Sequence, residues 1–139
     1  MKRILVNSLC ATMVVFALTV GARAQEMKDK EMMDKEMKPI VAVISAEWCP
    51  YCKNVEPVMM QLMKDYGEKM SFVIFDVTND EMIKKSMVKA EKLGLSDFFK
   101  EYKKKTSAVA VLNDKKIVYK TFNNAKREDY EMAFEKALK

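Results

Sequence analysis

The sequence has no histidine and little glycine, proline or cysteine, and each shortage excludes a class of site. Among 139 residues, glycine, proline and cysteine occur only three times each. Without histidine there can be no serine–histidine–aspartate triad, no histidine proton shuttle and no histidine-containing zinc site. Three glycines are too few for a glycine-rich phosphate loop, and three cysteines exclude a small domain built on several disulfides.

Charged residues of both signs are abundant, and their balance argues against nucleic acid as a partner. The chain has 25 Lys and Arg against 20 Asp and Glu, which gives a formal net charge of +5. Three of the positive residues, Lys2, Arg3 and Arg23, lie in the first 24 residues, which contain no acid. The remainder is therefore nearly neutral with interspersed signs, and we expect no nucleic-acid binding.

Residues 1–24 are predicted to be a signal peptide. Lys2 and Arg3 are followed by an apolar run over residues 9–20 and by Ala-Arg-Ala at 22–24. This order is typical of a secretory signal, with cleavage expected after Ala24. The run is short for a membrane-spanning helix, although a retained anchor is the alternative. The predicted location is the periplasm or the outside of the cell, with no membrane association after removal of the signal.

Residues 25–38 are predicted to be a charged, methionine-rich linker. The tetrapeptide Asp-Lys-Glu-Met occurs at 29–32 and again at 34–37, and the segment has no aromatic or β-branched residue before Pro39. Such a composition cannot bury enough apolar surface to order itself. Thioether sulfurs are also soft ligands that suit Cu(I). The alternative interpretation is therefore a copper site that uses Met27, Met32, Met33 and Met37.

Residues 39–139 are predicted to form one α/β domain, with a mixed central sheet flanked by helices, in the order β-α-β-α-β-β-α. The apolar patterns predict strands at 40–44, 71–77, 108–112 and 116–122, the last two forming a hairpin. They predict helices at 49–66 and 80–93, the second opened by a capping box that starts at Thr78. A short helix at 97–103 and a last helix capped by Asn124 complete the domain.

A Cys-x-x-Cys motif follows the first predicted strand and opens the first predicted helix. Two residues between Cys49 and Cys52 allow both sulfurs to meet in one small disulfide ring. A helix N-terminus stabilises a thiolate, and Pro50 suits the first helical turn. Lys53 stands where a haem-attachment site needs histidine, and a zinc site would need two further ligands. A disulfide closing so short a loop adds little stability, so the motif indicates a redox-active pair.

These residues resemble the active site of the thioredoxin family. The segment 46–53, Ala-Glu-Trp-Cys-Pro-Tyr-Cys-Lys, is followed by Pro57, and the resemblance runs over residues 39–139. It implies a thioredoxin-like fold in which Cys49 is the exposed attacking sulfur and Cys52 the shielded resolving sulfur. Trp48 would then pack beside the site, and Pro57 would kink the active-site helix.

The sequence departs from this family at several positions. The inner pair Pro50-Tyr51 resembles that of glutaredoxins, and Val43 stands where many thioredoxins carry a buried acid. Ser107 replaces the proline that usually precedes the third strand in cis. Because a non-proline cis bond costs roughly 2.5–4 kcal/mol, we expect the bond before Ser107 to be trans and its loop to lie beside Cys49.

The sequence therefore predicts an envelope-side protein-disulfide oxidoreductase that needs no cofactor and no metal. Its substrates would be protein thiols and disulfides, its redox partner is unidentified, and a monomer is expected. The alternatives are a Cu(I) carrier that uses the cysteine pair and linker methionines, and an interaction protein with incidental cysteines. The predicted catalytic residues are Cys49 and Cys52, with support from Trp48, Pro50, Tyr51, Lys53, Pro57 and Ser107.

Overall fold

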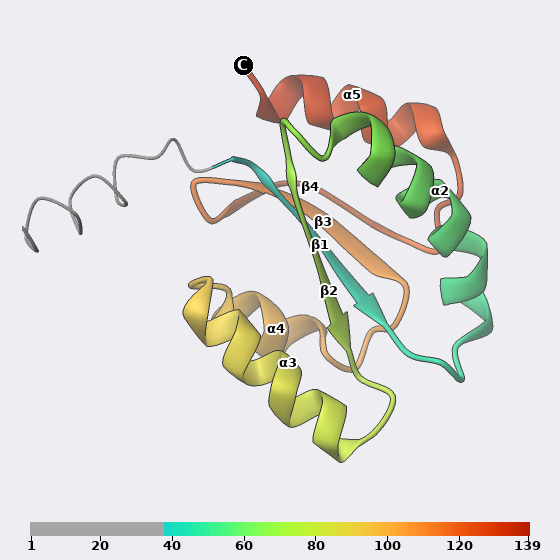
Figure 1. The fold of residues 1–139 in the computed structure, drawn as a ribbon, viewed down its shortest axis with the longest axis vertical. Coiled ribbons are helices and arrows are strands. Elements are labelled where there is room, and N and C mark those ends of the chain that lie inside the picture. The colour runs from blue at the N-terminus through green and yellow to red at the C-terminus, as the bar shows by residue number, and fades with distance from the viewer. Residues whose placement is uncertain (1–37) are drawn as a thin grey trace, which may run out of the picture. The chain divides into compact units, whose positions relative to one another are not determined.

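A computed structural model describes residues 38–139, and the predicted signal peptide and most of the predicted linker lie outside them. The described chain alternates strands and helices in the predicted order, with the short predicted helix as a separate element (Figure 1). The elements are β1 (Ile40–Ser45), α2 (Pro50–Tyr66), β2 (Ser71–Asp76), α3 (Asp80–Lys92), α4 (Ser96–Tyr102), β3 (Ala108–Asn113), β4 (Lys116–Phe122) and α5 (Arg127–Ala137).

The strands form one mixed sheet in the order β2-β1-β3-β4. β1 pairs in parallel with β2, and α2 makes the crossover between them, while β3 lies antiparallel to both β1 and β4. The β3–β4 turn has left-handed backbone at Asp114 (φ 48°) and Lys115 (φ 63°). Two positive φ values at the centre of a tight turn match the twist of the flanking strands, so the predicted hairpin is confirmed.

Helices cover both faces of the sheet, α2 and α5 on one face and α3 and α4 on the other (Figure 1). The central strand β1 shows why its sequence is apolar throughout. Val41 and Val43 face the α2 and α5 side, whereas Ala42 and Ile44 belong to the opposite cluster. A strand that is buried on both faces needs an apolar residue at every position, and this explains the unbroken run at 40–44.

The capping residues predicted for α3 and α5 agree only in part with those in the structure. Asn79 caps α3, because its side chain accepts a hydrogen bond from Met82 N at 3.0 Å, so the cap lies one residue after Thr78, where the predicted capping box starts. Asn124 does not cap α5, which begins at Arg127. Its side chain instead accepts from Lys126 N at 2.9 Å, and its carbonyl accepts from the Tyr130 hydroxyl at 2.6 Å. Asn124 therefore shapes the turn before the helix.

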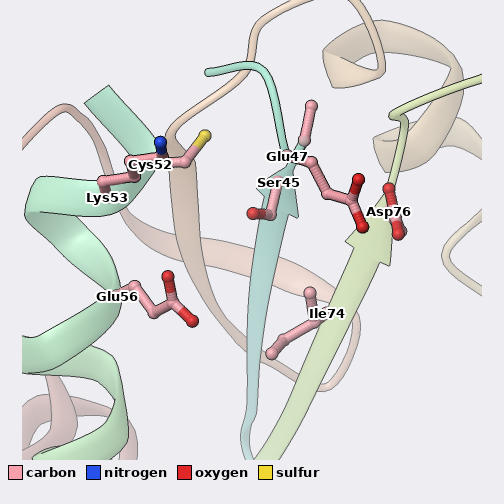
Figure 2. Close-up of a pocket in the computed structure, with 8 residues that line it drawn as sticks. Ser45, Glu47, Cys52, Lys53, Glu56, Ile74 and Asp76 are labelled. Carbon is pink, nitrogen blue, oxygen red and sulfur yellow. The ribbon is translucent and has the colours of Figure 1, made fainter. Parts of the chain in front are cut away.

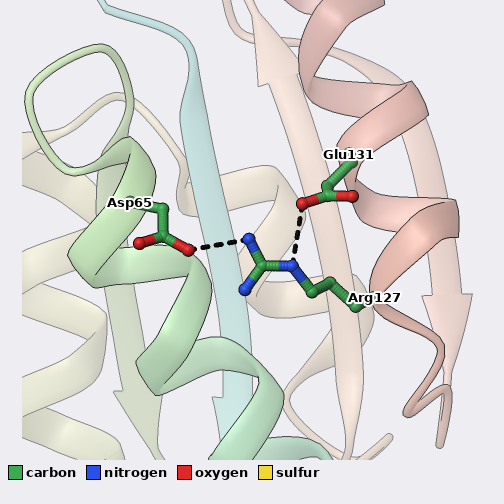
Figure 3. A network of polar contacts seen from close by, with 3 residues as sticks. All are labelled: Asp65, Arg127 and Glu131. Carbon is green, nitrogen blue, oxygen red and sulfur yellow. Dashed lines mark hydrogen bonds and ion pairs between the residues drawn. The ribbon is translucent and has the colours of Figure 1, made fainter.

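An ion-pair network joins α5 to α2 at the surface (Figure 3). Arg127 Nη2 lies 2.7 Å from Asp65 Oδ2, and Arg127 Nε lies 2.8 Å from Glu131 Oε1. The hydrogen bond that Arg127 donates to Asp65, followed by the one it donates to Glu131, raises the pKa of Arg127. The contact links two helices that flank the same face of the sheet.

Within residues 38–139, no helix combines the length and the apolar character that a membrane crossing requires.

Candidate active site

A disulfide joins Cys49 and Cys52 at the start of α2, with 5.4 Å between their Cα atoms. Cys49 is the N-cap residue, with extended backbone (φ −88°, ψ 109°), and Pro50 occupies the first turn as predicted. The Cys49 sulfur accepts a hydrogen bond from Cys52 N at 3.2 Å. An otherwise unpaired helix N–H and the positive end of the helix dipole therefore point at Cys49 Sγ, where they stabilise a thiolate.

Both cysteines are buried, and the prediction of an exposed Cys49 is wrong for this disulfide-bonded form. Only 1% of Cys49 and 7% of Cys52 is exposed. The reason is the tight turn before α2, in which Cys49 N donates to Ala46 O at 3.1 Å and Cys49 Sγ turns inward toward Cys52 N. Both side chains thereby join the apolar cluster that contains Ile44 and Ala108.

Two aromatic side chains flank the pair and stay largely exposed. Trp48 is 62% exposed and Tyr51 56% exposed. The Trp48 indole Nε1 donates to Thr78 O at 3.0 Å, so one edge of its ring is held while the rest faces solvent. The residues next to the cysteines therefore present aromatic surface to solvent, and Trp48 is not a core residue.

Side chains that follow β2 hold the loop before Cys49. The Thr78 hydroxyl donates to Asp76 Oδ1 at 2.6 Å and accepts from Glu47 N at 3.0 Å. Asp76 Oδ1 also accepts from Thr78 N at 2.8 Å. Our sequence reasoning missed this network, although an Asp-x-Thr pattern directly after a strand is a recognisable turn signal.

Ser107 lies beside the pair, as expected, but with an unexpected backbone. Ser107 N donates to Ile44 O at 2.9 Å, and the same carbonyl oxygen lies 4.0 Å from Cys52 Sγ. No peptide bond among residues 38–139 is cis, so the predicted trans bond before Ser107 is confirmed. The φ of Ser107 is 65°, a left-handed conformation that is uncommon for a residue other than glycine. The residue is also buried, so a serine with left-handed backbone stands close to Cys52.

A cavity of about 320 Å³ opens between α2 and the ends of β1 and β2 (Figure 2). Val43 does not line it, since its side chain packs with Val55 and Met59 beneath α2. Of the predicted supporting residues, Lys53 lines the cavity, whereas Pro57 lies farther along α2 and faces solvent. The lining residues are Ser45, Ala46, Glu47, Cys52, Lys53, Glu56, Ile74 and Asp76.

Among residues 38–139, no group of three or more Cys, Asp or Glu side chains is placed to hold a metal ion. The methionines of the copper hypothesis, Met27, Met32, Met33 and Met37, lie outside the described residues, so that hypothesis stays a prediction.

Known proteins resemble this chain in part of its sequence and in its fold. The sequence model of the thioredoxin family matches residues 22–120. The H-type thioredoxin of Chlamydomonas reinhardtii is 43% identical over 54 residues, which are 39% of this chain and 44% of that protein. The chain thus matches less than half of the length of this relative.

Solved structures of the same fold are more distant in sequence. A malarial protein is 20% identical, with a TM-score of 0.50, over 73% of this chain and 99% of that one. Fasciola hepatica thioredoxin is also 20% identical, with a TM-score of 0.49, over 82% of this chain and 93% of that one. Because the family model covers more than half of the sequence, and the mixed sheet carries a Cys-Pro-Tyr-Cys disulfide at the start of α2, the chain belongs to the thioredoxin family.

Proposed function

We propose that this protein is a thiol–disulfide oxidoreductase that acts on disulfides of other proteins. One observation carries the proposal: Cys49 and Cys52 close a disulfide at a helix N-terminus, and Cys49 Sγ accepts a backbone hydrogen bond there. A helix N-terminus favours the thiolate form of a cysteine placed there, and the thiolate is the nucleophile of disulfide exchange. Family membership agrees with this reaction.

The reaction proceeds in two exchanges. Cys49 thiolate attacks one sulfur of a substrate disulfide, which forms a mixed disulfide and releases the other substrate sulfur as a thiolate that takes a proton. Cys52 thiolate then attacks Cys49 Sγ, and the second substrate sulfur leaves. The substrate gains two electrons, and the Cys49–Cys52 pair becomes the disulfide that the structure contains. The reverse sequence donates a disulfide to a substrate dithiol.

The proposed site of action is outside the cytoplasm. The support is the sequence of residues 1–24, where a positive start, an apolar run and Ala-Arg-Ala form the pattern of a cleaved signal. Protein disulfides persist in such compartments, so substrates are available there. Mass spectrometry of the protein recovered from the cell envelope tests this directly. An N-terminus at Gln25 is expected, and an intact N-terminus in the cytoplasm would contradict it.

Reduction of insulin disulfides, with dithiothreitol as the electron source, tests the activity. We expect Cys49→Ser to abolish it, because the attacking thiolate is lost, and Cys52→Ser to accumulate a mixed disulfide on Cys49. Cys10→Ser is the matched control and should retain full activity, since Cys10 lies in the predicted signal peptide. An unchanged protein that does not accelerate insulin reduction, or a Cys49→Ser variant that still does, would overturn the proposal.

A further inference from the structure

We infer that Glu56 accepts, through water in the adjacent cavity, the proton that Cys52 must lose before it resolves the mixed disulfide. The inference rests on the proposed function and concerns its second exchange. Cys52 is 7% exposed, and a buried thiol ionises with difficulty because burial disfavours the charged form. The chain has no histidine, and the side chain under the helix at this level, Val43, is apolar. A carboxylate is therefore the available base.

Glu56 has the right position on α2. It follows Cys52 by four residues, so the two side chains lie one helical turn apart on the same face. Both line the cavity of about 320 Å³, far more than the space one water molecule needs. Figure 2 shows the Glu56 carboxylate reaching from α2 into this space, toward β1 and β2 and below Cys52. Water in the cavity can thus connect the carboxylate with the Cys52 sulfur.

The other charged groups around the cavity are less suited to this role. Asp76 Oδ1 already accepts two hydrogen bonds from Thr78, which hold its orientation and occupy that oxygen. Glu47 comes from the loop after β1, and its side chain points toward Asp76 in Figure 2. Lys53 is the cation among the lining residues and cannot accept a proton at neutral pH. Glu56 takes part in none of the ion pairs found within residues 38–139.

In the inferred step, the proton of Cys52 leaves before the new disulfide bond forms. The Cys52 thiol passes its proton to a cavity water, which passes a proton to the Glu56 carboxylate. The resulting Cys52 thiolate forms a bond to Cys49 Sγ, and the bond between Cys49 Sγ and the substrate sulfur breaks. The substrate leaves as a thiolate, which receives a proton from solvent, and Glu56 returns its own proton to solvent. No electron acceptor besides the substrate disulfide is needed.

Reaction with Ellman's reagent isolates this step. In a Cys10→Ser background the pair supplies the only two thiols. Attack by Cys49 releases one coloured thiolate quickly, and attack by Cys52 on the mixed disulfide releases the second. This leaving group needs no proton, so the second phase reports the ionisation of Cys52. It should be measured by stopped flow from about pH 5 to about pH 9, which spans the ordinary pKa values of glutamate and of a thiol.

We expect Glu56→Gln to slow the second phase by about 10-fold near pH 6 to 7, less than a base in direct contact provides, since water carries the proton. Above about pH 8.5, the ordinary pKa of a thiol, Cys52 ionises without help, and the two proteins should converge. The direction of the rate change distinguishes a proton acceptor from a carboxylate that acts only through its charge. A nearby carboxylate that only repels the thiolate would, on neutralisation, make the second phase faster.

Three variants complete the test. Glu47→Gln removes the same charge from the same cavity and should not slow the second phase. Glu56→Asp should restore most of the rate. Glu56→Ala should be slow, and added formate, which fits the cavity, should accelerate it in proportion to its concentration while leaving the Glu56→Gln rate unchanged.

The outcomes are distinguishable from a failure of the proposed function. If the unchanged protein releases two thiolates and reduces insulin, but Glu56→Gln keeps its rate and pH profile, the inference is overturned and the function stands. Equal slowing in Glu47→Gln and Glu56→Gln would also overturn it, because the effect would belong to the charge of the cavity. If the unchanged protein releases no second thiolate, both proposals fall together.

Discussion

The two loops that frame the cysteine pair are held in place in opposite ways. The loop before α2 is tied by side chains, since Thr78 joins Glu47 N to Asp76 and its carbonyl accepts from the Trp48 indole. The loop before β3 is tied by backbone alone, through Ser107 N and Ile44 O, and turns in a left-handed conformation. The first loop should therefore respond to changes of side-chain chemistry, and the second to changes of backbone freedom.

The largest expected effect comes from Ser107→Pro. Proline has no N–H for Ile44 O and cannot adopt a φ of 65°. We expect a loss of roughly 3 kcal/mol in the free energy of unfolding, from an unpaired buried carbonyl and an incompatible backbone angle. Chemical denaturation of the disulfide-bonded protein measures it. A variant as stable as the unchanged protein would show that this loop has a second conformation of similar energy.

Ser107→Gly is the matched control for backbone freedom. Glycine adopts a φ of 65° without strain, and this gain is partly offset by the greater entropy of the unfolded chain. We expect the free energy of unfolding to stay unchanged or to rise by up to about 1 kcal/mol. A clear loss would mean that the serine hydroxyl, and not the backbone, holds the loop.

Thr78→Val tests the side-chain tie and should have the next largest effect. Valine keeps the shape of threonine but removes the hydroxyl between Glu47 N and Asp76 Oδ1. We expect a loss of about 1–2 kcal/mol in the free energy of unfolding. Thr121→Val, on β4 and remote from the network of Thr78, Asp76 and Glu47, is the control and should change stability much less. Equal losses in the two variants would remove the special role of Thr78.

Trp48→Phe should have a smaller effect on stability. It removes the hydrogen bond from the indole to Thr78 O, but water can reach this exposed position. We expect a change within about 0.5 kcal/mol in the free energy of unfolding. The reaction with a protein disulfide should slow more than the reaction with Ellman's reagent. A protein substrate is large enough to contact the exposed Trp48 ring, and the small reagent is not. Equal slowing with both reagents would show that the Trp48 ring does not contact a protein substrate.

The smallest effect is expected for Arg127→Gln, which is remote from both loops. It removes the ion pairs with Asp65 and Glu131 at the surface (Figure 3). We expect Tm to fall by about 2 °C or less, and the difference to shrink as salt is added, because salt screens exposed charges. Cysteine reactivity should not change, and a change would link α5 to the site.

The sequence was sufficient for the elements and for the position of the pair. Continuous apolar runs, helical spacing and the capping pattern at 78–81 are local signals, and each predicted element appears within a few residues of its expected bounds. Cys49 at the N-cap and Pro50 in the first turn were likewise predictable, because a strand and a helix flank the motif.

What could not be predicted depends on contacts between segments far apart in the chain. Cys49 is buried because it packs in the cluster that contains Ile44 and Ala108. The left-handed backbone of Ser107 accompanies a hydrogen bond from Ser107 N to Ile44 O on β1, a residue far away in the sequence. The role inferred for Glu56 depends on a cavity that exists only once β2 lies beside α2. Asn124 was predicted to cap the last helix from its residue type alone, but in the structure its side chain accepts from Lys126 N in the turn before α5.

The outer strands of the sheet also decide how this domain meets other chains. In the described part of the protein, β2 and β4 form the two edges, and an edge can pair with a strand of another molecule. At one edge Lys89 Nζ donates to Ile74 O at 3.1 Å, and at the other β4 carries exposed Lys116 and Lys120. Charged edges of this kind oppose strand addition and aggregation. Strand addition at either edge of this sheet is therefore less favourable than at an uncharged edge.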